Sequence, residues 1–185
     1  MYNSPPPLDS IHTVVFDFDG VFTDNKVWLS QGGHESVCCD RGDGLGFDLI
    51  RVFQKRKEVK AEFFILSKET NPVVLGRAKK LKLNCYAGVQ DKLIFMREYF
   101  KTRYPDRYDP FSGLVYLGND LNDFPLMRRS GYAVAPADAH PRIREIAHLV
   151  LEQRGGEGFV RAFIERLLRI NDLTEEEIDE LISDC

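Results

Sequence analysis

The chain has 185 residues, a length that suits one domain with a buried core. Apolar residues make up 43% of the chain and charged residues 29%, which is the balance of an ordinary globular protein. The net charge of -4 argues against an electrostatic grip on nucleic acid or on an anionic membrane. A small anionic ligand would therefore have to be held by a local site.

No apolar run reaches the roughly 20 residues that a membrane-spanning helix needs. The first residues lack the basic and apolar segments of a secretory signal, and their run of prolines favours an extended chain. We expect residues 1–10 to form a disordered lead-in. The cysteines show no zinc-ligand spacing and are interpreted as free thiols of a reducing compartment: Cys38, Cys39, Cys85 and Cys185. These features predict a cytoplasmic protein.

The first third of the chain contains two buried strands. They are predicted at 13–16 and 61–66, because each is a short, continuous apolar run that ends in polar residues. Between them, Gln31-Gly32-Gly33 predicts the turn of a hairpin with arms at 26–29 and 35–39. Four apolar residues after the hairpin share one helical face: Leu45, Leu49, Ile50 and Phe53.

The rest of the chain alternates strands with helices. Further strands are predicted at 85–87, 114–117, 132–135 and 149–151. Further helices are predicted at 72–81, 92–104, 124–129, 141–147 and 159–170. Thr174 and Glu177 form a capping box before a final acidic helix. This alternation predicts an α/β fold with a doubly wound, mostly parallel sheet and helices on both faces.

Polar side chains follow several of the predicted strands. Asp17 and Asp19 come directly after the first strand, Ser67 follows the next long one, and Asp120 follows a third. Lys92 opens a helix after a fourth strand. In a doubly wound sheet, ligands bind beyond the carboxyl ends of the strands, so we expect these side chains to converge on one crevice. Carboxylates, a hydroxyl group and a lysine suit a divalent metal together with a phosphoryl group.

Four segments, in order, resemble the motifs of the haloacid dehalogenase (HAD) superfamily of phosphatases. The first motif is similar to residues 17–24 (DFDGVFTD), the second contains Ser67, and the third contains Lys92. The fourth is similar to residues 118–123 (GNDLND). Their order and spacing agree with the superfamily over roughly residues 11–168. The resemblance implies a HAD-like Rossmannoid fold and phosphatase activity.

Three segments narrow the resemblance to one subgroup: residues 41–46 (RGDGLG), residues 88–92 (GVQDK) and Gly155-Gly156. The subgroup contains phosphatases of 3-deoxy-D-manno-octulosonate 8-phosphate and of nonulosonate 9-phosphates, and the C-terminal domains of some CMP-sialic acid synthetases are close relatives. Residues 67–72 (SKETNP) depart from the Thr-Gly-Arg form that is common in the octulosonate branch. The resemblance implies a small phosphorylated sugar acid as substrate and leaves the particular sugar open.

The resemblance also implies roles for individual residues. Asp17, the backbone carbonyl of Asp19, and Asp120 would bind Mg2+. Asp17 would attack phosphorus to form an aspartyl phosphate, and Asp19 would act as general acid and then as general base. Ser67 would hydrogen-bond a phosphoryl oxygen, and Lys92 would neutralise charge in the transition state. Supporting or substrate-facing roles are implied for five more residues: Asp123, Asn119, Arg41, Asp43 and Gly44.

The intervals between the motifs leave no room for a large cap domain. Only the hairpin and one helix lie between Asp19 and Ser67, whereas a separate domain takes about 50 residues or more. The subgroup closes its open sites by assembling as a homotetramer, in which hairpins and C-terminal segments of neighbours contribute. We therefore expect a homotetramer of one HAD-like domain (11–170) with an acidic C-terminal helix (171–185).

Two other functions compete with an active phosphatase. One is a non-catalytic oligomerisation or regulatory domain, as in the related synthetases, and the other is a phospho-accepting signalling receiver. The joint presence of Asp17, Asp19, Lys92 and Asp120 favours catalysis over the first. A receiver fits poorly, because the acceptor aspartate lies at the first strand. The favoured prediction is a Mg2+-dependent phosphatase with no nucleic acid or membrane partner.

Overall fold

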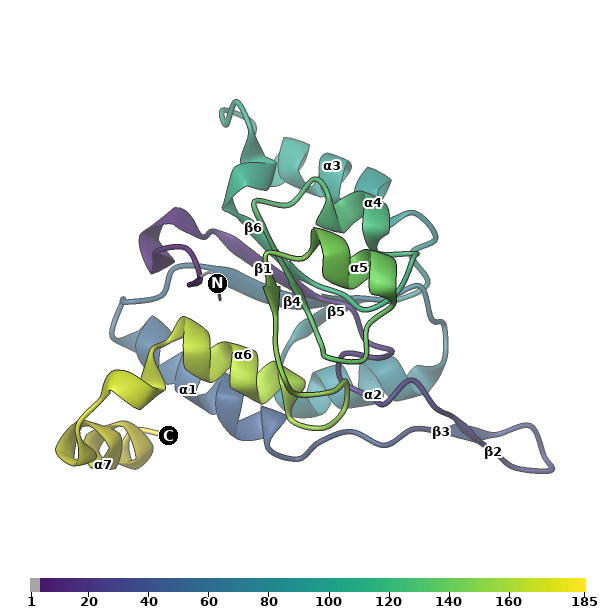
Figure 1. Ribbon diagram of the computed structural model, residues 1–185, viewed down its shortest axis with the longest axis horizontal. Coiled ribbons are helices and arrows are strands. Elements are labelled where there is room, and N and C mark those ends of the chain that lie inside the picture. The colour runs from purple at the N-terminus through teal and green to yellow at the C-terminus, as the bar shows by residue number, and fades with distance from the viewer. Residues whose placement is uncertain (1–3) are drawn as a thin grey trace.

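The computed structural model describes residues 4–185, and its centre is a six-stranded sheet in which all neighbouring strands are parallel (Figure 1). In spatial order the strands are β5 (Asn84–Tyr86), β4 (Glu62–Leu66), β1 (Thr13–Phe16), β6 (Leu114–Leu117), β7 (Tyr132–Ala135) and β8 (Leu149–Val150). The chain enters the sheet in the middle, at β1, and winds outward in both directions. This topology confirms the predicted doubly wound sheet.

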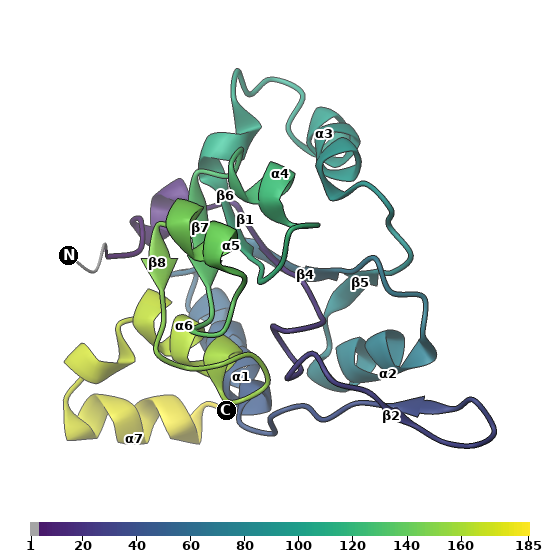
Figure 2. The same ribbon diagram turned by 45° about the vertical axis from the view of Figure 1, so that its right-hand side comes forward.

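Helices cover both faces of the sheet, as the two views in Figures 1 and 2 show. On one face lie α1 (Asp43–Lys55), α2 (Pro72–Leu81) and α6 (Phe159–Leu167). On the other face lie α3 (Lys92–Arg103), α4 (Phe124–Met127) and α5 (Pro141–Ile146). Because both faces are covered, the central strands are continuous apolar runs with no polar face.

Alternate residues of β1 face the two helical layers. Val14 and Phe16 belong to the core beneath α1 and α6, where the Phe16 and Phe47 ring centroids lie 5.5 Å apart. Val15 belongs to the second core, together with Met96 of α3. Burial of each such side chain contributes about 1.5–3 kcal/mol. Packing on both sides therefore fixes the carboxyl end of β1 and the position of the residues that follow it.

A small antiparallel hairpin, β2 (Trp28–Leu29) and β3 (Glu35–Ser36), projects from the body of the protein (Figure 2). Its paired arms are shorter than the predicted arms at 26–29 and 35–39, because no layer covers the hairpin and the side chains of both strands are exposed. The predicted hairpin is confirmed, and within residues 4–185 no larger cap domain stands between the motifs.

The described residues near the two ends of the chain pack against the core through Leu8 and Leu181. Residues 1–3 of the expected lead-in lie outside the described residues. Leu8–Ser10 forms a 3-10 helix (η1), so the disorder expected there is wrong. It is ordered because Ser10 Oγ donates to the Pro7 carbonyl at 2.7 Å and Leu8 packs against the core.

The C-terminal segment ends in an acidic helix, as predicted. α6 stops at Leu167, before the expected end at 170, and Arg169 has a left-handed φ of 56°. A 3-10 turn, η3 (Ile170–Asp172), then leads to α7 (Glu175–Ser183), which packs against α1. Thr174 and Glu177 form both hydrogen bonds of the predicted capping box. None of the helices in residues 4–185 is long and apolar enough to cross a membrane.

Candidate active site

A cleft of about 430 Å³ opens beyond the carboxyl ends of β1, β4 and β6. Five of the predicted site residues line it: Asp17, Asp19, Ser67, Asn119 and Asp120. The wall is completed by Asn25, Lys68, Glu69, Thr70, Gln90 and Asn122. A larger hollow of about 760 Å³, between residues 4–8 and the end of α6, includes none of the predicted site residues. The structure therefore brings these side chains together at the strand ends, as expected.

Asp17 is the first residue beyond β1, and its backbone N–H donates to the Leu117 carbonyl at 2.9 Å. Its carboxylate is buried, and Oδ1 accepts a hydrogen bond from the Phe18 N–H at 2.7 Å. Burial, followed by the charge of Asp123, raises the pKa of Asp17 to about 8, although Lys92 acts in the opposite direction. The site thus holds a carboxylate whose charge needs further compensation.

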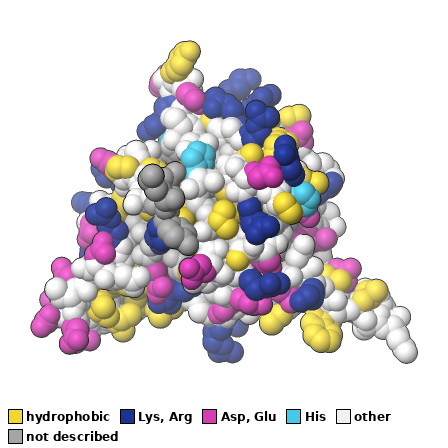
Figure 3. All heavy atoms as spheres, viewed as in Figure 1, with side chains coloured by type: hydrophobic (Ala, Val, Ile, Leu, Met, Phe, Trp, Pro, Cys, Tyr) yellow, Lys and Arg dark blue, Asp and Glu magenta, His cyan; other side chains and the backbone are white. Residues whose placement is uncertain are grey.

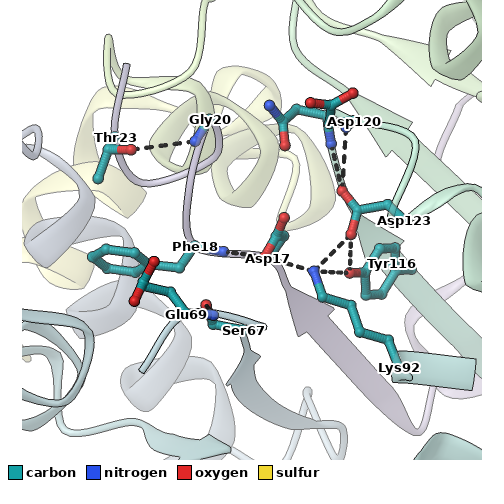
Figure 4. Close-up of polar contacts among 11 residues, drawn as sticks. Asp17, Phe18, Gly20, Thr23, Ser67, Glu69, Lys92, Tyr116, Asp120 and Asp123 are labelled. Atoms are coloured by element: carbon teal, nitrogen blue, oxygen red, sulfur yellow. Dashed lines mark hydrogen bonds and ion pairs between the residues drawn. The ribbon is translucent and has the colours of Figure 1, made fainter. Parts of the chain in front are cut away.

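Lys92 is the first residue of α3, and Asp91 caps that helix by accepting from the Ile94 N–H at 2.8 Å. The Lys92 ammonium lies 2.7 Å from Oδ1 of Asp17 and 2.7 Å from Oδ1 of Asp123 (Figure 4). Burial lowers the pKa of Lys92, but the two carboxylates outweigh it and the net pKa is raised. The side chain is therefore a permanent positive charge beside Asp17.

Asp123 joins Lys92 to the loop that carries Asp120. Its Oδ2 accepts from the backbone N–H groups of Asn119 at 2.9 Å and Asp120 at 3.3 Å, while its Oδ1 faces Lys92. A side chain at Gly118 would meet the Asp123 carboxylate at 2.6 Å, so the close approach requires glycine there. Asp123 thus fixes the loop and the lysine relative to each other.

Two further predicted residues lie at the edges of the cleft. Asp19 is half-buried; burial, followed by the charge of Glu69, raises its pKa, and Lys92 acts in the opposite direction. Ser67 directly follows β4, and its backbone N–H donates to the Tyr86 carbonyl at 2.9 Å. Its hydroxyl oxygen accepts from the Glu69 N–H at 3.0 Å. A carboxyl group with a raised pKa suits general acid chemistry, and a fixed hydroxyl suits an anionic ligand.

The donor chemistry of the cleft fits Mg2+. Asp17, Asp120 and the Asp19 backbone carbonyl offer oxygen atoms only, which is the ligand type that Mg2+ prefers. In residues 4–185 no three His, Cys, Asp or Glu side chains form a metal-binding group, and two carboxylates with one carbonyl do not conflict with that finding. A divalent cation would also compensate the excess of buried carboxylates over Lys92.

The structure does not bring Arg41, Asp43 and Gly44 to the cleft. The Asp43 side chain is buried at the start of α1, where Oδ1 accepts from the Arg161 N–H at 3.2 Å. Arg77 Nη2 lies 3.9 Å from its other oxygen. The expected substrate-facing position of Asp43 does not hold within this chain, because its carboxylate is enclosed between α1, α2 and α6. Arg41 is exposed beside it.

Sequence reasoning missed Tyr116, whose hydroxyl reaches Lys92 and Asp123. Tyr116 lies within an apolar run that predicts nothing more than a buried strand. The signal that could have found it is the strand alternation, because Tyr116 faces the same layer as α3, the helix that Lys92 opens. Lys68 and Glu69 also form part of the cleft wall, and no sequence motif indicates this.

Comparison with known proteins agrees with this geometry. No protein-family model matches the chain. The 3-deoxy-D-manno-octulosonate 8-phosphate phosphatase KdsC of Yersinia pestis is 29% identical over 169 residues, or 90% of this chain and 84% of that protein. A solved HAD family hydrolase from Streptomyces avermitilis is 34% identical, with a TM-score of 0.78 over 89% of this chain and 95% of that chain. A YrbI family phosphatase from Pseudomonas syringae is 30% identical, with a TM-score of 0.79 over 94% and 93%.

The fold and the acidic cleft at its strand ends are those of a hydrolase of the HAD superfamily, and the chain belongs to that superfamily. This confirms the resemblance that the four motifs indicate. Relatives in two of the three comparisons are named as phosphatases, and the chain is a phosphoric monoester hydrolase.

Proposed function

We propose that the chain is a Mg2+-dependent phosphatase of a small phosphorylated sugar acid, of the 3-deoxy-octulosonate 8-phosphate or nonulosonate 9-phosphate type. The substrate class is supported by the name of the relative from Yersinia pestis. The observation that carries the chemistry is the buried Asp17 carboxylate, which lies at the end of β1 and 2.7 Å from the Lys92 ammonium. An anionic nucleophile next to a fixed cation suits attack on a phosphate monoester.

The reaction proceeds in two displacements. Asp17 attacks phosphorus while the bond between phosphorus and the sugar oxygen breaks, and Asp19 gives its proton to that oxygen. The product is an aspartyl phosphate and a free sugar hydroxyl. Asp19 then takes a proton from water, whose oxygen attacks phosphorus, so that inorganic phosphate leaves and the Asp17 carboxylate is restored. Because Oδ1 of Asp17 is engaged by Phe18 and Lys92, Oδ2 is the attacking atom.

Four other residues prepare the site. Lys92 neutralises charge on the phosphoryl oxygens, and the Ser67 hydroxyl donates to one of them. Asp17, the Asp19 carbonyl and Asp120 would hold Mg2+, which when bound offsets the repulsion between the Asp17 carboxylate and the substrate dianion. Asp123 fixes the position of Lys92 relative to the Asp120 loop, because it forms hydrogen bonds with both.

The cleft wall also offers a partner for the carboxylate of a sugar acid. Among the described residues that line the cleft, Lys68 is the only one with an exposed basic side chain. Lys92 is buried against Asp17 and Asp123, so it lies next to the phosphoryl group of the substrate and not next to the sugar carboxylate. We assign Lys68 to the substrate carboxylate, where it would favour acidic sugars over neutral ones.

The experiment that tests this function is phosphate release measured with and without Mg2+. The substrates are octulosonate 8-phosphate, nonulosonate 9-phosphates and neutral sugar phosphates. Asp17→Asn is expected to lose activity by about 10⁴-fold or more while remaining folded. Asp43→Asn is the matched control, because it also changes a buried carboxyl group but lies outside the cleft. Retained turnover in Asp17→Asn would refute the nucleophile, and a preference for neutral substrates would refute the sugar-acid assignment.

We also propose that the protein works as a homotetramer. The observation that favours self-association is the projecting hairpin, on which Val27, Trp28 and Leu29 are 55%, 75% and 67% exposed. Figure 3 shows hydrophobic side chains along this arm at the lower right of the molecule. Light scattering should give four copies, and Trp28→Ser should shift the mass downward. A fully active monomer would refute the proposal.

A further inference from the structure

The hydroxyl group of Tyr116 is enclosed inside the site. Tyr116 is completely buried on β6, and its hydroxyl lies 2.7 Å from Asp123 Oδ1 and 3.1 Å from the Lys92 ammonium (Figure 4). Burial, followed by the charges of Asp123 and Asp17, raises the pKa of Tyr116 well above its ordinary value. The phenol therefore stays protonated and serves as a hydrogen-bond donor. None of the roles described so far accounts for a phenol at this position.

The donors and acceptors around Lys92 match in number. An ammonium group has three N–H donors, and three acceptors surround it: Asp17 Oδ1, Asp123 Oδ1 and the Tyr116 oxygen. The Tyr116 hydroxyl accepts from Lys92, so its own proton is available to Asp123 Oδ1. Tyr116, Lys92 and Asp123 thus form a closed triangle of hydrogen bonds. A satisfied buried network of this kind allows one arrangement of its side chains.

We infer that Tyr116 is a positioning residue for the hydrolysis, which holds the Lys92 ammonium in the orientation that Asp17 and the transferring phosphoryl group require. This inference rests on the roles proposed above for Asp17 and Lys92. Asp17 and Asp123 each accept one N–H of the ammonium, and Tyr116 accepts the third, so that all three N–H directions are fixed. Without the phenol, one buried N–H of Lys92 lacks an acceptor and the side chain gains alternative positions. Small misplacements of a catalytic group are costly, because an error of about 1 Å can lower the rate 10²-fold.

Tyr116→Phe tests the inference, because it removes one oxygen atom and keeps the ring that fills the core. We expect kcat to fall about 10-fold and KM to stay within about twofold, since positioning of Lys92 matters most in the transition state. The matched control is Tyr99→Phe. That change also removes a phenol that donates to a carboxylate, Glu62 Oε2 at 3.0 Å, but at a place outside the cleft. Thermal unfolding of both variants checks that they remain folded.

A double-mutant cycle separates positioning from a structural role. If Tyr116 acts through the triangle, Tyr116→Phe should lower kcat only slightly further in a protein whose triangle Asp123→Asn has already disturbed. The two losses in kcat are then not additive. Additive losses, or a full kcat in Tyr116→Phe while Asp17→Asn is inactive, would overturn the inference and leave the proposed function intact. If Asp17→Asn retains turnover, the proposed function fails together with this inference.

Discussion

Lys92 and Asp17 form a buried ion pair, with 2.7 Å between the ammonium nitrogen and Oδ1. Asp123 is buried at the same distance from the same ammonium group, so two carboxylates share one cation. When both carboxylates are ionised, the site therefore carries one uncompensated negative charge. Burial and then this imbalance raise the pKa of Asp17, and the imbalance makes the cleft suitable for a divalent cation.

Lys92→Met should remove both activity and stability. Methionine fills a similar volume but leaves Asp17 and Asp123 buried without a counter-charge, which costs about 3–5 kcal/mol for a buried pair that loses one partner. We expect kcat to fall by at least about 10²-fold, because a charge at the phosphoryl group is lost. Urea unfolding and phosphate release are the measurements. Lys101→Met is the control, since Lys101 is exposed and 3.8 Å from Glu98. Equal stability of the two variants would contradict the buried pairing.

The stability of the metal-free protein should depend on pH through Asp17. Its pKa is raised from 3.8 to about 8 on folding, so the folded state holds a proton that the unfolded state has lost. The stabilisation is complete below pH 3.8 and disappears as the pH rises to about 8. Mg2+ binds the ionised form, so its stabilising effect should grow over the same range. Unfolding temperatures with EDTA and with Mg2+ check this, and a Mg2+ effect independent of pH in this range would contradict it.

The sequence predicts the sheet well because its strands carry their own signal. Phe63, Val115 and their neighbours form continuous apolar runs, which only a strand covered on both faces requires. The polar residues after those runs, Asp17 and Ser67 among them, must then meet at one edge. Fold and cleft therefore follow from local patterns and from the rule for parallel sheets.

Other features depend on tertiary contacts that no local pattern contains. Asp43-Gly44 has the same turn signal whether its carboxylate faces a ligand or the Arg161 N–H, and the structure has the latter. Tyr116 has the same place in an apolar run whether its hydroxyl has no partner or accepts a hydrogen bond from Lys92, as it does in the structure. Leu8–Ser10 follows three prolines that favour an extended chain, yet contact with the core orders it.

Asp43→Asn should remove a second pH dependence without changing activity. Burial raises the pKa of Asp43 from 3.8 to about 7, so its contribution to stability is full below pH 3.8 and disappears as the pH rises to about 7. Asparagine keeps an oxygen for the Arg161 N–H and cannot ionise. The free energy of unfolding of the variant should therefore rise relative to that of the original protein as the pH rises over this range, by at most about 4 kcal/mol. Urea unfolding near pH 4 and pH 8 measures the difference. A constant difference would show that Asp43 is ionised throughout.

Lys68→Ala should weaken binding of acidic substrates only. Lys68 is exposed on the cleft wall, and an exposed ion pair contributes about 0.2–1 kcal/mol, so KM for a sugar-acid phosphate should rise by up to about fivefold. KM for a neutral sugar phosphate and kcat for both should be unchanged, because Lys68 takes no part in the ion pair between Lys92 and Asp17. Lys68→Arg should retain the preference, and Lys60→Ala, which changes an exposed lysine outside the cleft, should have no effect. An equal rise in KM for acidic and neutral substrates would instead place Lys68 at the phosphoryl end.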